Sequence, residues 1–593
     1  MDDSAAQGPV LGVTRSLTGR SWQWRAGDAR IGLGIAQRLE LPEVLGRLLA
    51  ARGIGMDEAG DFLEPKLRAL MPDPARLADM DAAADRIAAA VRSGEHVAVF
   101  GDYDVDGACA GALMTRFLRD LGCQVTPYVP DRIKEGYGPN APAIAALCDA
   151  GASLVICVDC GIAAGAALAA AEGRADVVVL DHHKAEGALP AVLAVVNPNR
   201  LDCTSGLKHI CAAAVAFLAA TATLRTLRRA DWFARRKEPD LLALLDIVAL
   251  ATVCDVMPLT GFNRALVAQG LKVLAKRGRI GLAALLDVAG QKDMPSAHTL
   301  GFVLGPRINA SGRIAEADLG LRLLLSEDAI EARVMAEKLD EVNRRRQEVE
   351  GDILGAALAM AEAQVAAGHA VLLLAAEGWH PGVVGIVAGR VKEKFNRPAC
   401  VAGIAGGIAK GSGRSITGID LGAAIIAGRE AGLLETGGGH PMAAGFSFRA
   451  EKQEAFHAFL EERLSHAAHL PSAADLVVEG ALNVGAASVA LAQDIARLAP
   501  FGAGNEEPIF ALARARVVRA DRIGKEGATI RAFVEGEGGG RLKTICFRAK
   551  EGPLAEALLS PDRTPLHLCG HLRAEAWHGE VTAGFQIVDA ARV

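Results

Sequence analysis

The sequence predicts a multidomain α/β protein whose first lobe is a doubly wound, mostly parallel sheet. The chain has 593 residues, which corresponds to roughly three to five domains of ordinary size. From about residue 80, short apolar segments alternate with segments rich in alanine and leucine, an order typical of parallel strands joined by helices. Half of the residues are apolar (51%) and 23% are charged. That composition favours a folded globular chain over a disordered or fibrous one.

Composition also excludes several classes of protein. Eleven cysteines without regular spacing do not make a disulfide framework and suit a reducing compartment. The acidic N-terminus lacks the basic and apolar regions of a secretory signal. The longest uncharged apolar run, 210–224, is too short to span a bilayer, and we expect a buried helix there. We therefore expect a cytoplasmic protein without a membrane partner.

The predicted elements follow in chain order. We expect a helix near 108–121 and parallel strands at 96–100, 124–129, 153–159, 177–181 and 192–197. A charged, helix-favouring stretch then connects to a second unit of strands and helices. The last 120 residues contain short β-like segments separated by turn residues, which is typical of a small barrel or sandwich. The domains we expect are an N-terminal extension (1–78), a first α/β domain (79–325), a connecting helix (326–355), a second α/β domain (356–468) and a β domain (475–593).

Acidic residues follow four apolar segments that we interpret as strands. The ligands of an open parallel sheet gather beyond the carboxyl ends of its strands, so these residues are candidates for one site. Three aspartates follow the strand at 96–100, one follows the strand at 153–158, and Asp-His-His follows the strand at 177–180. A further aspartate follows the segment 247–254. The residues are Asp102, Asp104, Asp106, Asp159, Asp181, His182, His183 and Asp255.

This mixture of carboxylates and imidazoles predicts a centre for two divalent cations. Several negative charges at one sheet edge repel one another unless cations neutralise them. Oxygen and imidazole ligands suit Mn²⁺ or Mg²⁺ better than the thiolate-rich sets of structural zinc sites. A calcium loop is a weaker interpretation of 102–107, because Leu113 stands where the bidentate glutamate should be. The pair Cys157 and Cys160 favours ordinary packing, since no second pair completes a zinc set.

The order of four motifs resembles the DHH phosphoesterase superfamily. The motifs are GDYDVDG (101–107), VDCG (158–161), DHH (181–183) and TVCDVMPL (252–259). Three later motifs resemble the DHH-associated domain of the same superfamily: EGWHPGVVGIVAGR (377–390), GSGRS (411–415) and GGGHPMAAGF (437–446). With GPRINASGR (305–313) and PFGAGNEEPIF (500–510), the resemblance covers about residues 80 to 593.

The resemblance implies a role for each residue of the predicted centre. The implied metal ligands are Asp104, Asp106, Asp159, His182 and Asp255, with Asp102 as an alternative within the triple-aspartate loop, and Asp159 bridging the two ions. The implied catalytic residues are Asp104, Asp106, Asp159, His182 and His183. Of these, His183 is expected to contact phosphate or to donate a proton, and Asp181 to orient an imidazole.

The resemblance also implies which residues bind the substrate. Arg307, Asn309 and Arg313 would contact phosphates near the metals, and His380 would approach the scissile or terminal phosphate. Ser412, Arg414 and Ser415, together with a glycine-rich loop formed by Gly438, Gly439 and His440, would bind phosphate through hydroxyls, a guanidinium and backbone N–H groups. A glycine-rich loop alone more often marks a turn that needs positive φ.

The implied activity is 5′→3′ exonucleolytic hydrolysis of single-stranded DNA to mononucleotides, in DNA repair and recombination. The β domain would be an oligonucleotide-binding barrel with a basic groove. The groove residues we expect are Arg514, Arg516, Arg519, Arg522, Lys525, Arg531, Arg541, Lys543 and Arg548. We expect Phe501, Phe510, Phe533 and Phe547 to be core residues rather than base-stacking rings.

The partners expected are single-stranded DNA, a single-strand-binding protein and a repair helicase, with the chain a monomer. Two alternatives stay open. One is a phosphodiesterase of the same fold that acts on short oligoribonucleotides or cyclic dinucleotides. The other is a catalytically inactive scaffold that binds nucleic acid, although every motif carboxylate and histidine is present here.

Overall fold

The computed structural model describes residues 8–131, 135–185, 187–469, 473–524, 527–560, 562, 564–577 and 580–593. The chain divides into two compact units, which we call unit 1 and unit 2. Unit 2 contains residues 60–345 and 500–506, and unit 1 contains the residues before 60, 346–499 and 507–593. Among the described residues, no helix combines the length and the apolar character needed to cross a membrane.

Unit 2 is built on the predicted parallel sheet. Its five strands lie in the order β3, β2, β4, β5, β6, and every neighbouring pair is parallel. All five predicted strands are confirmed within one or two residues: β2 (His96–Gly101), β3 (Gln124–Tyr128), β4 (Leu154–Val158), β5 (Asp176–Leu180) and β6 (Ala194–Val196). The carboxyl ends of adjacent strands therefore meet at one edge.

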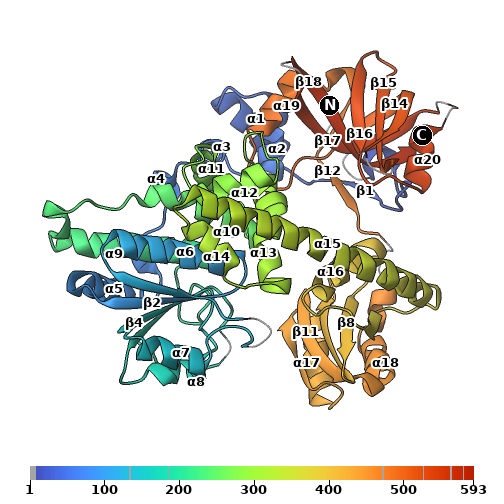
Figure 1. The fold of residues 1–593 in the computed structure, drawn as a ribbon. Coiled ribbons are helices and arrows are strands. Elements are labelled where there is room, and N and C mark those ends of the chain that lie inside the picture. Colours follow the sequence, from blue (N-terminus) through green and yellow to red (C-terminus); the bar gives the residue numbers. More distant parts are fainter. Residues whose placement is uncertain are drawn as a thin grey trace. The chain divides into compact units, whose positions relative to one another are not determined.

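Helices cover both faces of this sheet (Figure 1). Side chains of each strand point alternately to the two faces, so Val97 and Val99 belong to one apolar cluster while Ala98 and Phe100 belong to another. The first cluster includes α5 (Met80–Ser93), α6 (Val105–Asp120) and α9 (Ala212–Arg229), and the second includes α7 (Ala141–Asp149) and α8 (Gly165–Leu168). Helix α9 confirms the buried helix predicted at 210–224.

The remainder of unit 2 is helical. It contains the short α3 (Ala59–Leu63) and α4 (Leu67–Leu70), then α10 (Leu245–Cys254), α11 (Gly261–Ala275), α12 (Ile280–Val288), a π-helical turn (Thr299–Leu304), α13 (Gly305–Ile314) and α14 (Leu319–Leu325). The expected strand at 247–254 is wrong, because these residues form α10. A short apolar segment that is buried on all sides has no periodicity to distinguish strand from helix.

The connecting helix is confirmed as α15 (Ala329–Ala366) and extends further than predicted. The boundary between the units falls within it, at residues 345 and 346. In unit 1, the C-terminal half of α15 and α16 (Val384–Phe395) pack with the strands of a mixed five-stranded sheet. The strand order is β10 (Thr436–His440), β11 (Ala443–Arg449), β9 (Ile408–Arg414), β8 (Ala399–Ala405) and β7 (Leu372–Glu377). Helices α17 (Leu421–Glu430) and α18 (Gln453–Arg463) pack in a second cluster against the same sheet.

The C-terminal residues form the predicted barrel. Its strands are β14 (Phe510–Ile523), β15 (Thr529–Glu535), β16 (Arg541–Cys546), β18 (Glu580–Arg592) and β17 (Leu566–Trp577), in that order. An antiparallel pairing of β17 with β14 closes the circle, and the short β13 (Gly480–Leu482) adds to β14. Helices α19 (Val489–Ala496) and α20 (Pro553–Leu559) accompany these strands.

Residues 8–59 of the N-terminal extension, which contain no predicted site residue, belong to unit 1. Besides α1 (Ala29–Arg38) and α2 (Glu43–Ala51), it contributes β1 (Trp22–Trp24), which pairs in parallel with β12 (Leu476–Val478). The fully buried Trp22 donates its Nε1–H to Asp589 at 2.9 Å. Val10, Val13 and Trp22 share an apolar cluster with residues of β12, β14, β17 and β18, so the extension packs against one face of these strands.

Candidate metal centre

The loop after β2 brings its three aspartates to the carboxyl edge of the sheet. Asp104 caps α6, accepting the N–H of Gly107 at 3.0 Å. A Cβ on Gly107 would lie 2.5–2.7 Å from backbone atoms of Asp102, so only glycine lets the helix start this close to the strand. Asp106 is buried in the first turn of α6, where its oxygens accept the N–H groups of Ala212 (2.6 Å) and Ala213 (2.9 Å) at the start of α9.

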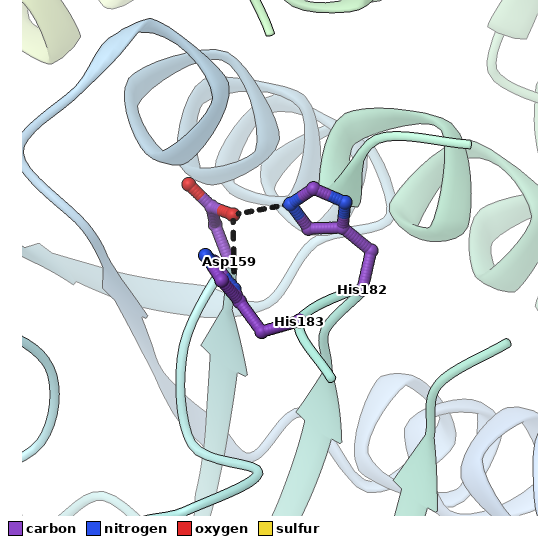
Figure 2. Close-up of side chains that lie close together, drawn as sticks. All are labelled: Asp159, His182 and His183. Atoms are coloured by element: carbon purple, nitrogen blue, oxygen red, sulfur yellow. Dashed lines mark ion pairs between the residues drawn. The ribbon is translucent and has the colours of Figure 1, made fainter. Parts of the chain in front are cut away.

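The ends of β4 and β5 supply the next ligands. Asp159 follows β4 with a φ of 60°, a left-handed conformation that is strained for a residue other than glycine and is common at functional sites. Figure 2 shows its carboxylate facing the rings of His182 and His183, which follow β5. The Nε2 atom of His182 lies 3.3 Å from Asp159 Oδ1, and the Nδ1 atom of His183 lies 3.9 Å from the same oxygen.

His182 also faces the other carboxylates. Its Nε2 atom lies 3.5 Å from Asp255 Oδ2 and 3.7 Å from Asp106 Oδ2. Asp255 reaches this position as the residue that ends α10, rather than from a strand end. At this centre, potential ligand atoms within 4.8 Å of one another form three groups: Asp106, His182 and Asp255; Asp102, Asp104 and Asp159; and Asp159, His182 and His183. Asp159 and His182 each belong to two of these groups.

The electrostatics of the cluster fit a pair of cations. Burial, followed by the charges of the neighbouring aspartates, raises the pKa of Asp159 well above its ordinary value and raises the pKa of Asp255 to about 8. Burial likewise raises the pKa of Asp106. Asp159 Oδ1 and Asp255 Oδ2 are buried and accept no hydrogen bond. Buried carboxylate oxygens without donors are costly unless a cation binds them, so the donor set suits Mn²⁺ or Mg²⁺.

Asp181 orients the DHH segment rather than facing the other carboxylates as a ligand. It is fully buried, and its Oδ1 atom accepts from the N–H groups of His182 and His183 and lies 2.8 Å from Nδ1 of His183. Burial alone would raise the pKa of Asp181, but the hydrogen bond and charge of His183 outweigh burial and lower it. Burial lowers and Asp181 raises the pKa of His183, with a net increase to about 9. The His183 side chain is 45% exposed, so it can reach a substrate.

Sequence reasoning missed three side chains around the centre. The Tyr137 hydroxyl lies 3.3 Å from both ring nitrogens of His183 and donates to the Asp159 carbonyl at 3.2 Å. Asn197 and Asn199 donate to the carbonyls of His183 and His182, respectively. An isolated tyrosine or asparagine has no motif signal, although both asparagines closely follow β6, the next strand of the sheet.

The GPRINASGR motif forms α13. Its three predicted phosphate-binding residues have different surroundings. Asn309 lies at the acidic loop, because its Oδ1 atom accepts the N–H of Val105 at 3.2 Å. Arg313 is half-buried and follows Gly312, whose added Cβ would lie 2.5 Å from the Tyr103 carbonyl. Arg307, in contrast, is engaged by Asp340 of α15 at 3.0 Å.

Three of the predicted substrate-binding residues of unit 1 lie near the start of α16. Arg414 donates to the Ser412 hydroxyl at 2.8 Å, and both lie against Gly385 at the start of α16. Burial lowers the pKa of Arg414, and among the described residues it makes no ion pair. A largely buried guanidinium beside a helix N-terminus is suited to an anion. His380 precedes the same helix, and its Nδ1 accepts the N–H of Gly382 at 3.1 Å.

Two expectations about these motifs need correction. Ser415 is buried, and its hydroxyl donates to the Ile419 carbonyl at 2.8 Å, so the structure places it in the fold rather than at an open surface. Gly438, Gly439 and His440 form β10, not a loop. Close packing requires glycine at one position of this strand: a Cβ on Gly437 would lie 2.9 Å from the side chains of Ile425 in α17 and Leu434.

The expected basic groove of the barrel is partly neutralised by ion pairs. Arg514 pairs with Glu537, Arg519 and Arg531 with Asp521, and Lys543 with Glu575. Arg522 donates to two backbone carbonyls, and Arg541 lies over the ring of Phe533, 5.2 Å from its centroid. Arg516 and Arg548 are exposed. Lys525 lies outside the described residues.

The prediction that four phenylalanines of the β domain are core residues is confirmed in part. Phe510 is fully buried, as predicted, whereas Phe547 is 53% exposed and the core interpretation of it is wrong. Phe501 and Phe533 are half-buried. Phe547 and the neighbouring Arg548 follow β16, which leaves an exposed aromatic and an exposed cation side by side in the chain.

Three segments of the chain match family models. Residues 96–252 match the DHH family N-terminal domain, 367–466 the DHHA1 domain, and 478–589 the RecJ OB domain. The parallel sheet with its Asp and His residues at the carboxyl edge, together with the DHHA1 unit, defines a DHH phosphoesterase.

Relatives over nearly the full length identify the family within that class. The chain is 34% identical over 579 residues to the single-stranded-DNA-specific exonuclease RecJ of Bacillus subtilis, covering 96% of this chain and 70% of the relative. It is 36% identical over 521 residues to RecJ of Escherichia coli, covering 85% and 88%. The chain belongs to the RecJ family.

Solved structures agree with this assignment. The structure of Thermus thermophilus RecJ in complex with Mn²⁺ matches with a TM-score of 0.79 at 30% identity, covering 96% of this chain and 79% of that one. The Mg²⁺ complex of the same protein matches with a TM-score of 0.74 at 29% identity, covering 96% and 78%.

Proposed function

We propose that this chain is a metal-dependent exonuclease that degrades single-stranded DNA from the 5′ end and releases 5′-mononucleotides. One observation carries the proposal: carboxylates and an imidazole from four separate segments converge at one sheet edge, where two buried carboxylate oxygens accept no hydrogen bond. The RecJ relatives are named single-stranded-DNA-specific exonucleases, which supports the choice of DNA as substrate.

The ligand groups suggest how two ions would be held. Asp106, His182 and Asp255 would hold one ion, and Asp102 and Asp104 would hold the other, with Asp159 shared. Two such ions, when bound, lower the pKa of a water nucleophile and stabilise the oxygens of an in-line phosphoryl displacement. The backbone N–H groups of Ala212 and Ala213 donate to Asp106 and hold its carboxylate in place.

His183 is positioned to act on the substrate. Asp181 fixes its Nδ1 side and keeps the ring protonated at neutral pH. A partly exposed imidazolium beside the metal ligands can contact the scissile phosphate or protonate the leaving oxygen. Asn309 and Arg313 of α13 would contact neighbouring phosphates.

The remaining contacts to DNA would come from unit 1. Ser412 and Arg414 form a polar pair at the start of α16 that suits a phosphate, with His380 and His440 as further contacts. On the barrel, Arg516 and Arg548 supply exposed cations and Phe547 an exposed ring, the combination that binds single strands through the backbone and base stacking.

The same resemblance supports proposals about the partners, the oligomeric state and the cellular location of the enzyme. A single-strand-binding protein and a repair helicase would be its partners, and it would act as a monomer in DNA repair and recombination. The cytoplasm is the expected location, because all eleven cysteines are free thiols in the structure and a reducing compartment keeps them so.

A gel assay tests the proposal directly. The purified protein is incubated with single strands labelled at the 5′ or the 3′ end and with the matching duplex, in Mn²⁺ or in EDTA. We expect the 5′-labelled strand to yield labelled mononucleotide at once, the duplex to persist, and EDTA to stop the reaction. Cleavage of short oligoribonucleotides or cyclic dinucleotides alone would overturn the proposal, as would binding without any cleavage.

A further inference from the structure

Asp255 differs from the other candidate ligands in how the fold supports it. The others belong to loops and helix starts at the edge of the parallel sheet. Asp255 follows α10 and begins the connection 255–260 to α11. The next residue, Val256, has a φ of 56° and is 69% exposed. A β-branched residue in this conformation is strained, so the surrounding structure must hold the connection in place.

Several hydrogen bonds hold the connection, and three of them involve Met257, Pro258 and Leu259. The N–H of Met257 donates to the Thr252 carbonyl of α10 at 3.1 Å. The side-chain amide of Asn263 in α11 donates to the Pro258 carbonyl at 3.1 Å. The third bond comes from a distant part of the sequence: the N–H of Leu259 donates to the carbonyl of Ala503 at 2.7 Å.

The segment Pro500–Glu506, which we call the clasp, is a closed turn. It lies between α19 and β14, inside the expected β domain, yet it belongs to unit 2. Gly502 and Asn505 exchange backbone hydrogen bonds of 3.0 and 3.1 Å. The Asn505 side chain is 1% exposed and donates to the Pro500 carbonyl at 2.9 Å. These bonds present the Ala503 carbonyl at the tip of the turn.

The clasp and the connection pack too closely for any residue larger than glycine at positions 502 and 504. A Cβ on Gly502 would lie 2.8 Å from the Leu259 side chain, and one on Gly504 would lie 3.0 Å from Pro258. Gly504 also has a φ of 70°. Leu259 is 1% exposed, and Arg264 of α11 donates to the Pro500 carbonyl at 3.3 Å. The clasp therefore contacts both the second half of the connection and α11, the helix that follows it.

We propose that the clasp is a positioning element for the metal ligand Asp255, and that Asn505 is its positioning residue. The proposal rests on the metal centre of the proposed function. Metal ligands must be held within a few tenths of an ångström of their bonding distance, and a strained six-residue connection does not provide that precision alone. By closing the turn, Asn505 fixes the Ala503 carbonyl, which fixes Leu259 four residues after the ligand.

The test measures metal binding directly. Asn505→Ala removes the amide that closes the turn, and Gly504→Ala disrupts the same contact by a clash with Pro258. Asn483→Ala is the matched control, since Asn483 is exposed and its side chain caps no helix. Mn²⁺ binding to the full, metal-free chain is measured by titration calorimetry, and the folding of each variant by circular dichroism and thermal unfolding.

We expect both variants to bind Mn²⁺ about five- to tenfold more weakly, because supporting partners of metal ligands commonly contribute 10- to 100-fold and Asn505 acts from further away. Exonuclease activity at limiting Mn²⁺ should fall and return at saturating Mn²⁺, while the control behaves as the parent protein. Unchanged Mn²⁺ affinity in a folded variant would overturn the proposal, even if its melting temperature fell. If the protein lacked exonuclease activity altogether, the calorimetric comparison would still decide the role of the clasp.

Discussion

At the scale of single residues, the centre is a set of charges that the protein alone does not neutralise. Asp159 is buried among four other aspartates that raise its pKa, and one of its oxygens accepts no hydrogen bond. Its left-handed backbone adds strain. Such a residue opposes folding of the metal-free protein and favours binding of a cation.

Replacing Asp159 with asparagine should separate these two effects. We expect Asp159→Asn to abolish cleavage and to weaken Mn²⁺ binding by more than about 100-fold, since even indirect partners of metal ligands contribute 10- to 100-fold. The metal-free variant should be more stable than the parent by about 1–3 kcal/mol, because a buried charge is removed. Calorimetry and urea unfolding in EDTA measure the two quantities. Asp81→Asn, at an exposed position of α5, is the control, and undiminished cleavage would contradict the assignment.

The raised pKa values also predict how stability depends on pH. Asp255 has a pKa of about 8 in the fold, against about 4 when unfolded. Between these values the folded state holds a proton that the unfolded state has released, so stability falls as pH rises, by about 1.4 kcal/mol per pH unit for one such group. The EDTA-treated protein should therefore melt at a progressively lower temperature from pH 5 to pH 8. Saturating Mn²⁺ should flatten this slope, and an unchanged slope with Mn²⁺ would argue against carboxylate ligation.

At the scale of elements, the centre depends on how tightly α6 begins after β2. The helix carries Asp106 in its first turn, and its cap is Asp104. The N-terminal end of a helix favours negative charge, which helps to hold carboxylates that repel one another. Two glycines of α6 differ sharply in their surroundings: Gly107 lies against the Asp102 backbone, whereas a Cβ on Gly111 would meet Leu321 only at 3.5 Å.

This contrast gives a matched pair of substitutions within one helix. Gly107→Ala should lower the free energy of unfolding by about 1–3 kcal/mol, as expected of an overpacked site, and should lower Mn²⁺ affinity because the acidic loop is displaced. Gly111→Ala should leave metal binding unchanged, with stability equal or slightly higher from better helix propensity. Thermal unfolding and calorimetry on both variants test this. Equal metal affinity in the two variants would show that the close start of α6 is not required.

At the scale of the whole molecule, each of the two compact units is assembled from segments that are separated in the sequence. The N-terminal extension packs against strands of the barrel through Trp22, and the clasp, which lies inside the β domain in sequence, belongs to unit 2. Most of the barrel's basic side chains are engaged in ion pairs or backbone contacts. The exposed Arg516 and Arg548 are therefore the cations most available to DNA phosphates.

This distribution of charge predicts a length-dependent effect on the substrate. Replacing Arg516 and Arg548 together with alanine should weaken binding of long single strands and reduce the salt slope of log K by about 1 to 2, as the loss of two phosphate contacts requires. Cleavage of very short oligomers should remain nearly intact. Fluorescence anisotropy at several salt concentrations measures the slope. Arg68→Ala, an exposed site of α4 in unit 2, should change nothing, and equal losses on short and long substrates would count against a separate binding surface.

The sequence by itself determined the parallel sheet, the buried helix α9, the connecting helix and the barrel, because each has a period or a turn pattern that local chemistry imposes. It also determined the aspartates and histidines of the centre, since carboxyl ends of neighbouring parallel strands must meet. Only the tertiary structure decided that Asp255 ends a helix, that Ser415 is buried, and that Gly438 to His440 form a strand. It alone brought Tyr137 to His183 and Ala503 to the connection after Asp255. These placements depend on contacts between segments far apart in the chain, and local periodicity carries no information about such contacts.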